Sequence, residues 1–344
     1  MPLNIDDYEY DLPADLIANK PLPKRDNCRL LCLDKKTNLI SHKIFKNLID
    51  LLGKNDILVL NQSKVFPARI FGKKDSGGDI ELLLIRQLSS TLWLAISKPR
   101  PKVGKKINFD QNLVGKIIKS NPTTGQIEIK FNQKNEKFFQ ILDQIGHTPL
   151  PSYIHSCQKE SQLRTEYQTV YANTIGSAAA PTAGLHFTKS LLSKLKKRGV
   201  QIEYITLHVG LGTFQNLRPE NIKTKTLHTE FYEIDIDTAK RLNLAKKEKK
   251  RIIAVGTTTI RTLESAIKLD GEIKPGVQST NIFIYPPFKF KFVDSLITNF
   301  HLPKSSLLML VSAFVSKDQI FLAYKEAIEN KYRFFSFGDA MFIS

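Results

Sequence analysis

Residues 252–264 read IIAVGTTTIRTLE, and this stretch decides the fold class. Its four leading apolar residues predict a short buried strand, and we expect a helix from Thr257 to Leu269 directly after Gly256. A strand followed closely by a helix is the repeating unit of an α/β domain.

The same alternation continues upstream of this stretch. Thr188 is placed to cap a helix that stops at Gly199, and residues 200–209 form a strand candidate. Asp237 is placed to cap a further helix at 238–250. Strands and helices therefore alternate along the C-terminal part of the chain.

Before this part the pattern is different. Closely spaced strand candidates, separated by turns with glycine or proline, lie at 81–85, 92–96, 116–119 and 125–131. Such spacing predicts a small antiparallel barrel. Residues 56–60 predict a buried strand ahead of it, and residues 61–67 a turn-rich exit from that strand.

The length of 344 residues makes two domains the natural expectation. The segment before Asp56 lacks a core of its own, so we expect it to pack on the α/β part. We therefore predict a discontinuous α/β catalytic domain formed by residues 1–65 and 149–344, with residues 66–148 inserted as an antiparallel β-barrel domain.

The formal net charge of +18 attracts phosphate backbones, which makes nucleic acid the leading class of partner. The alternative is that the lysines only solvate helix faces, as in the run at 194–198. Charge alone leaves both interpretations open.

The three cysteines, Cys28, Cys32 and Cys157, are an odd number that suits a reducing compartment. The start of the chain lacks the layout of a secretory signal, and no apolar stretch approaches the ~20 residues of a membrane-spanning helix. We expect a cytoplasmic protein with no membrane anchor. No metal-ligand spacing is visible, so no metal site is predicted.

Two segments rich in small residues are candidates for a ligand site. Residues 178–187 read AAAPTAGLHF, and so many small residues indicate that the backbone closely approaches another group. That group could be a ligand. The alternative is a tight crossover before the next helix, in which His186 is a loop histidine whose hydrogen bonds are made within the protein. Residues 207–214 read LHVGLGTF, where a strand candidate ends in two glycines beside His208. We interpret this as a nest for a ligand.

The beginning of the helix at Thr257 is a candidate anion site, because free amides and hydroxyls meet there. Arg261 near the first turns could clamp an anion. The alternative, which the segment by itself slightly favours, is a capped helix with a surface pair of Arg261 and Glu264.

Residues 227–233 read LHTEFYE, which places His228, Glu230 and Tyr232 on one face of a strand. A carboxylate beside an imidazole suits proton transfer, but polar residues on a solvent-facing strand give the same pattern. His301, in the segment 298–306, is expected at a core edge. The aromatic segment 332–342 is expected to be docked, either as core or as a stacking wall for a base.

In order along the chain, the motifs at 179–187, 207–210, 255–258, 298–303 and 338–342 closely resemble the S-adenosylmethionine:tRNA ribosyltransferase-isomerase family of the queuosine pathway. The likeness runs the full length of the chain. It implies a barrel-like α/β main domain with an inserted small β-barrel. It also implies transfer of a ribosyl unit from S-adenosylmethionine onto 7-aminomethyl-7-deazaguanine at the tRNA wobble position, which gives epoxyqueuosine and releases adenine and methionine.

The resemblance and the chemistry together suggest residue roles. A sulfonium acidifies the protons on the ribose carbon beside it, and a positioned base can remove one. The candidate proton-transfer groups are His186, His208, His228 and His301, with Glu230 as orienter or base. The candidate contacts to the co-substrate are Thr182, Gly184, Gly210, Gly212, Gly256, Thr257, Thr258, Arg261 and Phe300.

Among these contacts, Arg261 and the amides of 256–258 would hold the methionine carboxylate or a tRNA phosphate, and Phe300 would face the sulfonium or adenine. S-adenosylmethionine acts as a co-substrate, and no permanently bound cofactor is expected. The protein is expected to be a monomer.

One position departs from the family pattern: Lys64 stands where the family carries arginine, before the matching 66–69. Lysine lacks the bidentate fork of arginine, so it would hold RNA or the co-substrate at this position only as a point charge. Two other functions remain open. A non-catalytic RNA-binding protein would bind tRNA without consuming S-adenosylmethionine, and a methyltransferase would release S-adenosylhomocysteine.

Overall fold

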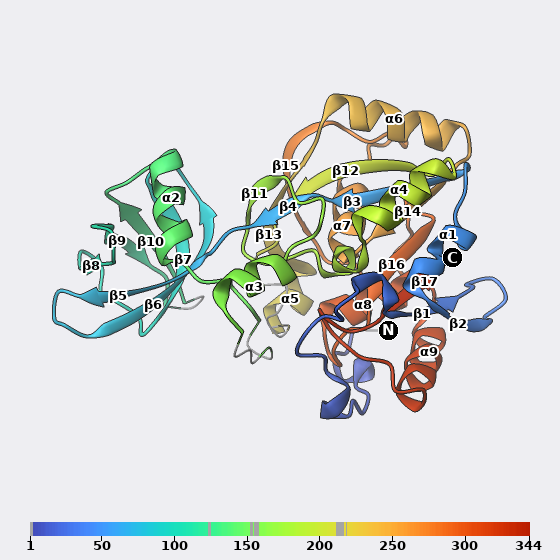
Figure 1. The fold of residues 1–344 in the computed structure, drawn as a ribbon, viewed down its shortest axis with the longest axis horizontal. Helices are drawn as coiled ribbons and strands as arrows, with labels where there is room; N and C mark the ends of the chain where they lie inside the picture. The colour runs from blue at the N-terminus through green and yellow to red at the C-terminus, as the bar shows by residue number, and fades with distance from the viewer. Residues whose placement is uncertain (1–2, 123–124, 152–153, 155–157, 211–216, 218) are drawn as a thin grey trace.

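Strand β3 (Asp56–Asn61) lies inside a nine-stranded mixed sheet, and all six of its residues are buried. The computed structural model describes residues 3–344 except 123–124, 152–153, 155–157, 211–216 and 218. The strand order in the sheet is β15-β13-β12-β3-β14-β16-β17-β1-β2 (Figure 1). These other strands span Arg29–Leu33 (β1), Ile40–Ile44 (β2), Gln201–Leu207 (β12), Thr226–Ile234 (β13), Arg251–Val255 (β14), Gly276–Ile282 (β15), Ser295–Asn299 (β16) and Ala340–Ile343 (β17).

The middle of the sheet is parallel, since the three pairs β12–β3, β3–β14 and β14–β16 are all parallel. Both faces of this region are covered: Ile57 and Val59 belong to one hydrophobic core, while Leu58 and Leu60 belong to another. A strand buried on both faces has a continuous apolar sequence, which is why the sequence of residues 56–60 predicted a buried strand. 

Helices outside the barrel span Leu48–Leu51 (α1), Glu160–Glu166 (α3), Lys189–Lys197 (α4), Pro219–Thr224 (α5), Ile236–Lys247 (α6), Thr257–Ala266 (α7), Ser306–Phe314 (α8) and Lys317–Glu329 (α9). Most of them lie on the large sheet, while α3 lies beside the segment 66–148, where Arg164 donates to the Gly146 carbonyl at 2.6 Å. Short 3-10 helices occupy Asp6–Tyr8 (η1), Ala14–Leu16 (η2), Arg25–Asn27 (η3), Phe45–Asn47 (η4) and Thr182–His186 (η5).

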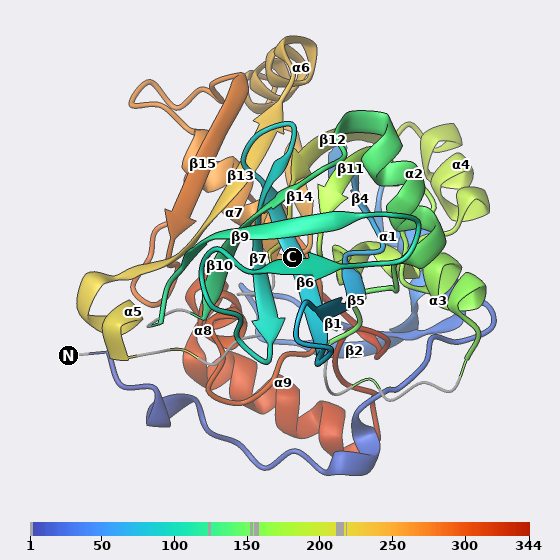
Figure 2. The same ribbon diagram turned by 90° about the vertical axis from the view of Figure 1, so that its left-hand side faces the viewer.

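A separate closed antiparallel barrel has the strand order β10-β7-β6-β5-β8-β9 and stands at one side of the large sheet (Figures 1 and 2). Trp93 in its core lies 5.2 Å from the ring of Phe138 on a helix that packs on the barrel. All these elements fall inside the segment 66–148. They span Arg69–Lys74 (β5), Asp79–Gln87 (β6), Leu92–Lys98 (β7), Lys106–Asn108 (β8), Val114–Ser120 (β9), Gln126–Phe131 (β10) and Asn135–Ile145 (α2).

The barrel and the large sheet are joined by a two-stranded parallel pair, β4 (Ser63–Val65) with β11 (Thr174–Ser177). The turn predicted at 61–67 is therefore wrong in part, because Ser63 to Val65 find a distant partner strand that local sequence does not reveal. Lys64 is exposed on β4. A second link is the Arg86 guanidinium of β6, which lies 4.6 Å from the centre of the Phe231 ring of β13.

The predicted fold class, α/β with an inserted antiparallel barrel, is confirmed. Thr188 caps α4 as predicted, accepting the amide hydrogen of Leu191 at 3.1 Å. The predicted Asp237 cap is wrong: Asp235 accepts the amide hydrogen of Thr238 at 2.8 Å, so α6 begins before Asp237.

The N-terminal strands β1 and β2 join the large sheet through β17, as the absence of a separate core predicted. The C-terminal aromatic segment is docked, with Phe334, Phe337 and Phe342 buried. No single helix in the described part of the chain is long and apolar enough to cross a membrane; α8 and α9 meet that test only as a pair bent by 112°.

Candidate functional site

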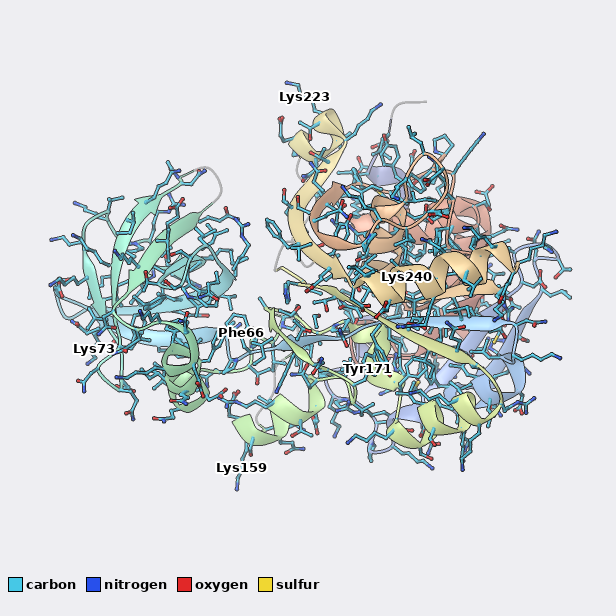
Figure 3. All side chains as sticks on the ribbon, turned by 90° about the horizontal axis from the view of Figure 1, so that it is seen from above. Phe66, Lys73, Lys159, Tyr171, Lys223 and Lys240 are labelled. Atoms are coloured by element: carbon cyan, nitrogen blue, oxygen red, sulfur yellow. The ribbon has the colours of Figure 1, made fainter. Side chains whose placement is uncertain are left out.

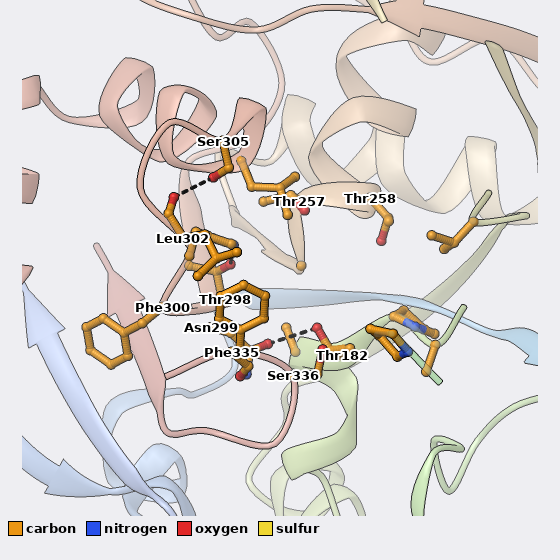
Figure 4. Close-up of a pocket in the computed structure, with 18 of the residues that line it drawn as sticks. Thr182, Thr257, Thr258, Thr298, Asn299, Phe300, Leu302, Ser305, Phe335 and Ser336 are labelled. Carbon is orange, nitrogen blue, oxygen red and sulfur yellow. Dashed lines mark hydrogen bonds between the residues drawn. The ribbon is translucent and has the colours of Figure 1, made fainter. Parts of the chain in front are cut away.

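A first cavity lies at the carboxyl ends of the neighbouring parallel strands β14 and β16, where ligands bind in α/β sheets (Figure 4). We call it the threonine cavity. Its volume is about 280 Å³. The polar side chains that line it include Thr182, Thr257, Thr258, Thr298, Asn299 and His301.

The first turn of α7 forms one wall of the threonine cavity. Gly256 has a φ of +86°, a conformation that favours glycine, and it turns the chain sharply from β14 into the helix. Thr257 and Thr258 of the first turn line the cavity, so the positive end of the ten-residue helix dipole faces it. The Thr258 hydroxyl also accepts from Asn61 Nδ2 at 3.4 Å, which fixes its rotamer.

Asn299, at the end of β16, organises the opposite wall. Its Oδ1 accepts the Thr182 hydroxyl at 3.2 Å, and its Nδ2 donates to the Phe335 carbonyl at 3.1 Å (Figure 4). Nδ2 is also 2.9 Å from His186 Nε2, which accepts from it. Sequence reasoning missed Asn299, although a polar residue that ends an apolar strand was a usable signal.

His186 lies behind this wall and is buried. Burial lowers its pKa to about 4, so the ring is neutral near pH 7. Since Nε2 accepts from Asn299, the proton is assigned to Nδ1, which lies 3.2 Å from Cys28 Sγ. His186 therefore holds Asn299 in place and does not line the cavity. Of the two interpretations of the segment 178–187, the structure supports the one in which the hydrogen bonds of His186 are made within the protein.

His301 lines the threonine cavity and is also held by core residues. Its Nδ1 and Nε2 lie 3.3 Å from the hydroxyls of Tyr324 and Thr298, respectively. Burial lowers the pKa of His301 to about 3, so the ring is neutral near pH 7. Both ring nitrogens are therefore engaged by hydroxyl groups of neighbouring residues, and the neutral ring forms part of the cavity wall.

A second cavity, which we call the interdomain cavity, has a volume of about 970 Å³. One side is formed by β6 and β7 of the barrel, and the other by β13 and the segment after β12. His208, Gly210, His228 and Glu230 line it, so four of the predicted site residues lie together here.

The two cavities share a wall. His208 and Gly210 line the interdomain cavity, while Val209 between them lines the threonine cavity. Gly176, with a φ of +150°, makes room for this wall, since a Cβ there would lie 2.6 Å from the His208 ring. Burial lowers the pKa of His208.

Glu230 is the buried centre of a polar cluster at the interdomain cavity. It pairs with Arg261, accepts the Gly210 amide hydrogen at 3.0 Å, and its Oε1 lies 3.1 Å from His228 Nε2. Burial by itself raises the pKa of Glu230, but the charge of Arg261 and the contact with His228 outweigh it, and the pKa falls to about 2. The carboxylate is therefore ionised at neutral pH. The predicted shared face of His228, Glu230 and Tyr232 on β13 is confirmed; Glu230 and Tyr232 are buried, while the His228 side chain is 30% exposed at the cavity.

Arg261 differs from both predictions made for it. It lies on α7 but binds Glu230, not an anion in the threonine cavity, because the second turn of the helix points it toward β13. The surface pair with Glu264 is also wrong. Glu264 is buried and accepts the amide hydrogens of residues 291, 292 and 293.

Two further residues predicted to contact the co-substrate, Phe300 and Gly184, do not present a side chain or a free surface to the cavity, and a third lies outside the described residues. The Phe300 ring is fully buried against Tyr324 and Phe334 and points away from the cavity, so only its backbone reaches the wall (Figure 4). Gly184 serves packing, because a Cβ there would lie 2.0 Å from the Tyr171 hydroxyl. Gly212 lies outside the described residues.

Comparison with known proteins identifies the family. Residues 5–343 match the model of the queuosine biosynthesis protein family. The chain belongs to this family. The family match covers the barrel, the large sheet and both cavities.

Its similarity to named members is high. It is 48% identical to the S-adenosylmethionine:tRNA ribosyltransferase-isomerase of Halothermothrix orenii, over 99% of this chain and all of the relative. It is 50% identical to the protein of that name from Caldanaerobacter subterraneus, over 98% of each chain. The crystal structure of a Thermotoga maritima S-adenosylmethionine tRNA ribosyltransferase is similar with a TM-score of 0.56 and 37% identity, over 98% of this chain and all of that one.

Proposed function

We propose that this protein transfers and isomerises the ribosyl unit of S-adenosylmethionine onto 7-aminomethyl-7-deazaguanine at the tRNA wobble position, giving epoxyqueuosine and releasing adenine and methionine. The names of its close relatives support a tRNA ribosyltransferase-isomerase. The structural observation that carries the proposal is the pair of cavities that share the wall at 208–210, since two substrates must meet.

The threonine cavity suits the methionine part of the co-substrate. The carboxylate of S-adenosylmethionine would lie at the first turn of α7, where Thr257 and Thr258 meet the positive end of the helix dipole. Asn299 and Thr182 supply oriented polar groups on the opposite wall. Their fixed positions lower the entropy lost on binding.

The interdomain cavity suits the acceptor base. A base must leave its stack before an enzyme can act on it, and an aromatic-lined pocket stabilises the extruded base. Phe139 of the barrel helix and Phe231 of β13 line this cavity, so both parts of the protein contribute.

His228 is the proposed base of the reaction. Its side chain is 30% exposed at the cavity, while its Nε2 faces the ionised Glu230. The carboxylate favours the tautomer with the proton on Nε2, which leaves the Nδ1 lone pair available. Nδ1 would take a proton from the ribose carbon bonded to the sulfonium, and the electron pair would stay on that carbon, stabilised by the adjacent positive sulfur.

The test is to mix the protein with S-adenosylmethionine and tRNA that carries 7-aminomethyl-7-deazaguanine. Adenine and methionine should appear in equal amounts, with a mass shift of the modified nucleoside. His228→Gln should slow adenine release, while the matched control His42→Gln, at the exposed edge strand β2, should not. Binding of tRNA without adenine release would favour an RNA-binding protein, and S-adenosylhomocysteine would indicate a methyltransferase; either result contradicts the proposal.

A further inference from the structure

We propose that three lysines on the outer wall of the barrel bind the phosphate backbone of the tRNA; this inference rests on the proposed function, because it takes tRNA as the substrate. They are Lys106 of β8, Lys116 of β9 and Lys130 of β10, and we call them the lysine row. The strand register places Lys106 opposite Lys116, and Lys116 opposite Lys130. All three are exposed.

The row faces outward because its neighbours face inward. Ile107, Ile117 and Ile129, each adjacent in sequence to one lysine, are fully buried in the barrel core. Side chains alternate between the two faces of a strand, so the three lysines stand side by side on the outer surface. Lys73 on the next strand, β5, lies on the barrel (Figure 3) and pairs with Asn108 of β8, two residues from Lys106; both Lys73 and Asn108 are exposed, so the register places Lys73 on the same outer face.

Such a row is unfavourable for the isolated protein. Residues directly opposite on neighbouring strands have Cβ atoms about 4.5–5.5 Å apart, and like charges there destabilise a sheet. Within the described residues, none of the three lysines forms an ion pair. The nearest carboxylate along β10, Glu128, lies 3.7 Å from Lys119 instead. A bound polyanion would supply the missing negative charge.

The surrounding sequence has the same bias. From Lys98 to Lys119, both included, the chain carries seven basic residues and one acidic residue, Asp110. The Lys105 carbonyl accepts the amide hydrogen of Ile117 at 3.0 Å, which brings a further lysine next to the row. A dense field of one sign attracts a phosphate backbone by releasing its counterions.

The row is also close to the interdomain cavity along a single strand. Gln126 lines that cavity, and Lys130 lies four residues further on the same face of β10, about 13 Å away at the rise of a strand. An RNA whose base occupies the cavity can therefore continue its backbone onto the row.

The test compares two triple variants with the same change in net charge. K106Q/K116Q/K130Q removes the row, and K194Q/K196Q/K197Q removes three exposed lysines of α4, which lies away from the barrel (Figure 1). Binding of tRNA without S-adenosylmethionine is measured over a range of salt concentrations, with thermal melts as a check of folding. The row variant should weaken binding about tenfold at low salt and reduce the salt slope by about 2, since each lost phosphate contact removes roughly 0.7–0.9. The α4 variant should behave like the wild type.

Equal weakening by both variants, or unchanged binding by the row variant, would overturn the inference. The row variant should also keep its kcat at saturating tRNA and change only the KM for tRNA. Failure of the proposed function would appear differently, as wild-type protein that releases no adenine, and the binding comparison would still be valid in that case.

Discussion

Glu230 and Arg261 form an ion pair in the interior of the protein, with side chains only 1% and 4% exposed. The pair joins β13 to α7, and it places an ionised carboxylate beside His228 at the interdomain cavity. Arg261 is therefore a positioning residue, because it acts on the cavity through Glu230.

Replacing Arg261 by methionine should lower the free energy of unfolding by about 3–5 kcal/mol, because the Glu230 carboxylate would stay buried without its counter-charge. The double variant E230Q/R261M should recover part of this loss, since no buried charge is left. Urea unfolding of both single variants and the double variant measures the coupling. Equal stability of R261M and the double variant would show that the unpaired Glu230 carboxylate is not the cause of the loss.

His228→Gln should lower kcat for adenine release by about 10²–10⁴-fold, the usual contribution of a positioned base. Binding of S-adenosylmethionine should change little, because the threonine cavity is not lined by His228. Single-turnover adenine release and equilibrium binding separate the two effects. A variant that loses binding but keeps its rate would remove His228 from the role of base.

The sequence predicted those parts of the fold and site that depend on local pattern. The buried strand β3 and the cap at Thr188 follow from apolar runs and capping chemistry, and the shared face of His228 and Glu230 follows from the alternation of a strand. These features are decided by residues close together in the chain.

The features of the site that the sequence did not predict depend on contacts between segments far apart in the chain. Arg261 binds a residue 31 positions earlier, and His186 is neutralised by burial against Cys28, 158 positions away. Asn299 could be seen as a polar strand end, but the three residues that its side chain contacts come from segments that only the fold brings together. The interdomain cavity likewise exists only once the barrel is placed beside β13.

Gly184→Ala should destabilise the protein by about 1–3 kcal/mol, the usual effect of overpacking, because the new Cβ would lie 2.0 Å from the Tyr171 hydroxyl. This hydroxyl is buried and has no hydrogen-bond partner among the described residues, so Tyr171→Phe alone should be nearly neutral. Combining the two changes should restore part of the stability. Thermal melts of the three variants test the packing role; an undiminished melting temperature for G184A would show that the site can relax.

Stability should fall on mild acidification because two histidines are buried in the neutral form. The pKa is lowered to about 4 for His186 and to about 3 for His301, while both rings titrate near 6.5 in the unfolded chain. Between these values the unfolded state binds more protons, so the stabilising contribution is present above pH 6.5 and is lost as the pH falls toward 4.

The free energy of unfolding should therefore decrease as the pH falls from 6.5, with His186 and His301 contributing at most about 2.7 kcal/mol per pH unit because two protons are taken up on unfolding. His208 adds to this slope, since burial lowers its pKa as well. Between pH 6.5 and about 5.5 the unfolded carboxyl groups are still largely ionised, so the histidines dominate the slope there. Urea unfolding at several pH values measures the slope. His301→Gln should reduce it by the share of one proton, at most about 1.4 kcal/mol per pH unit. A wild-type stability that is flat across this window would contradict the burial of neutral imidazoles.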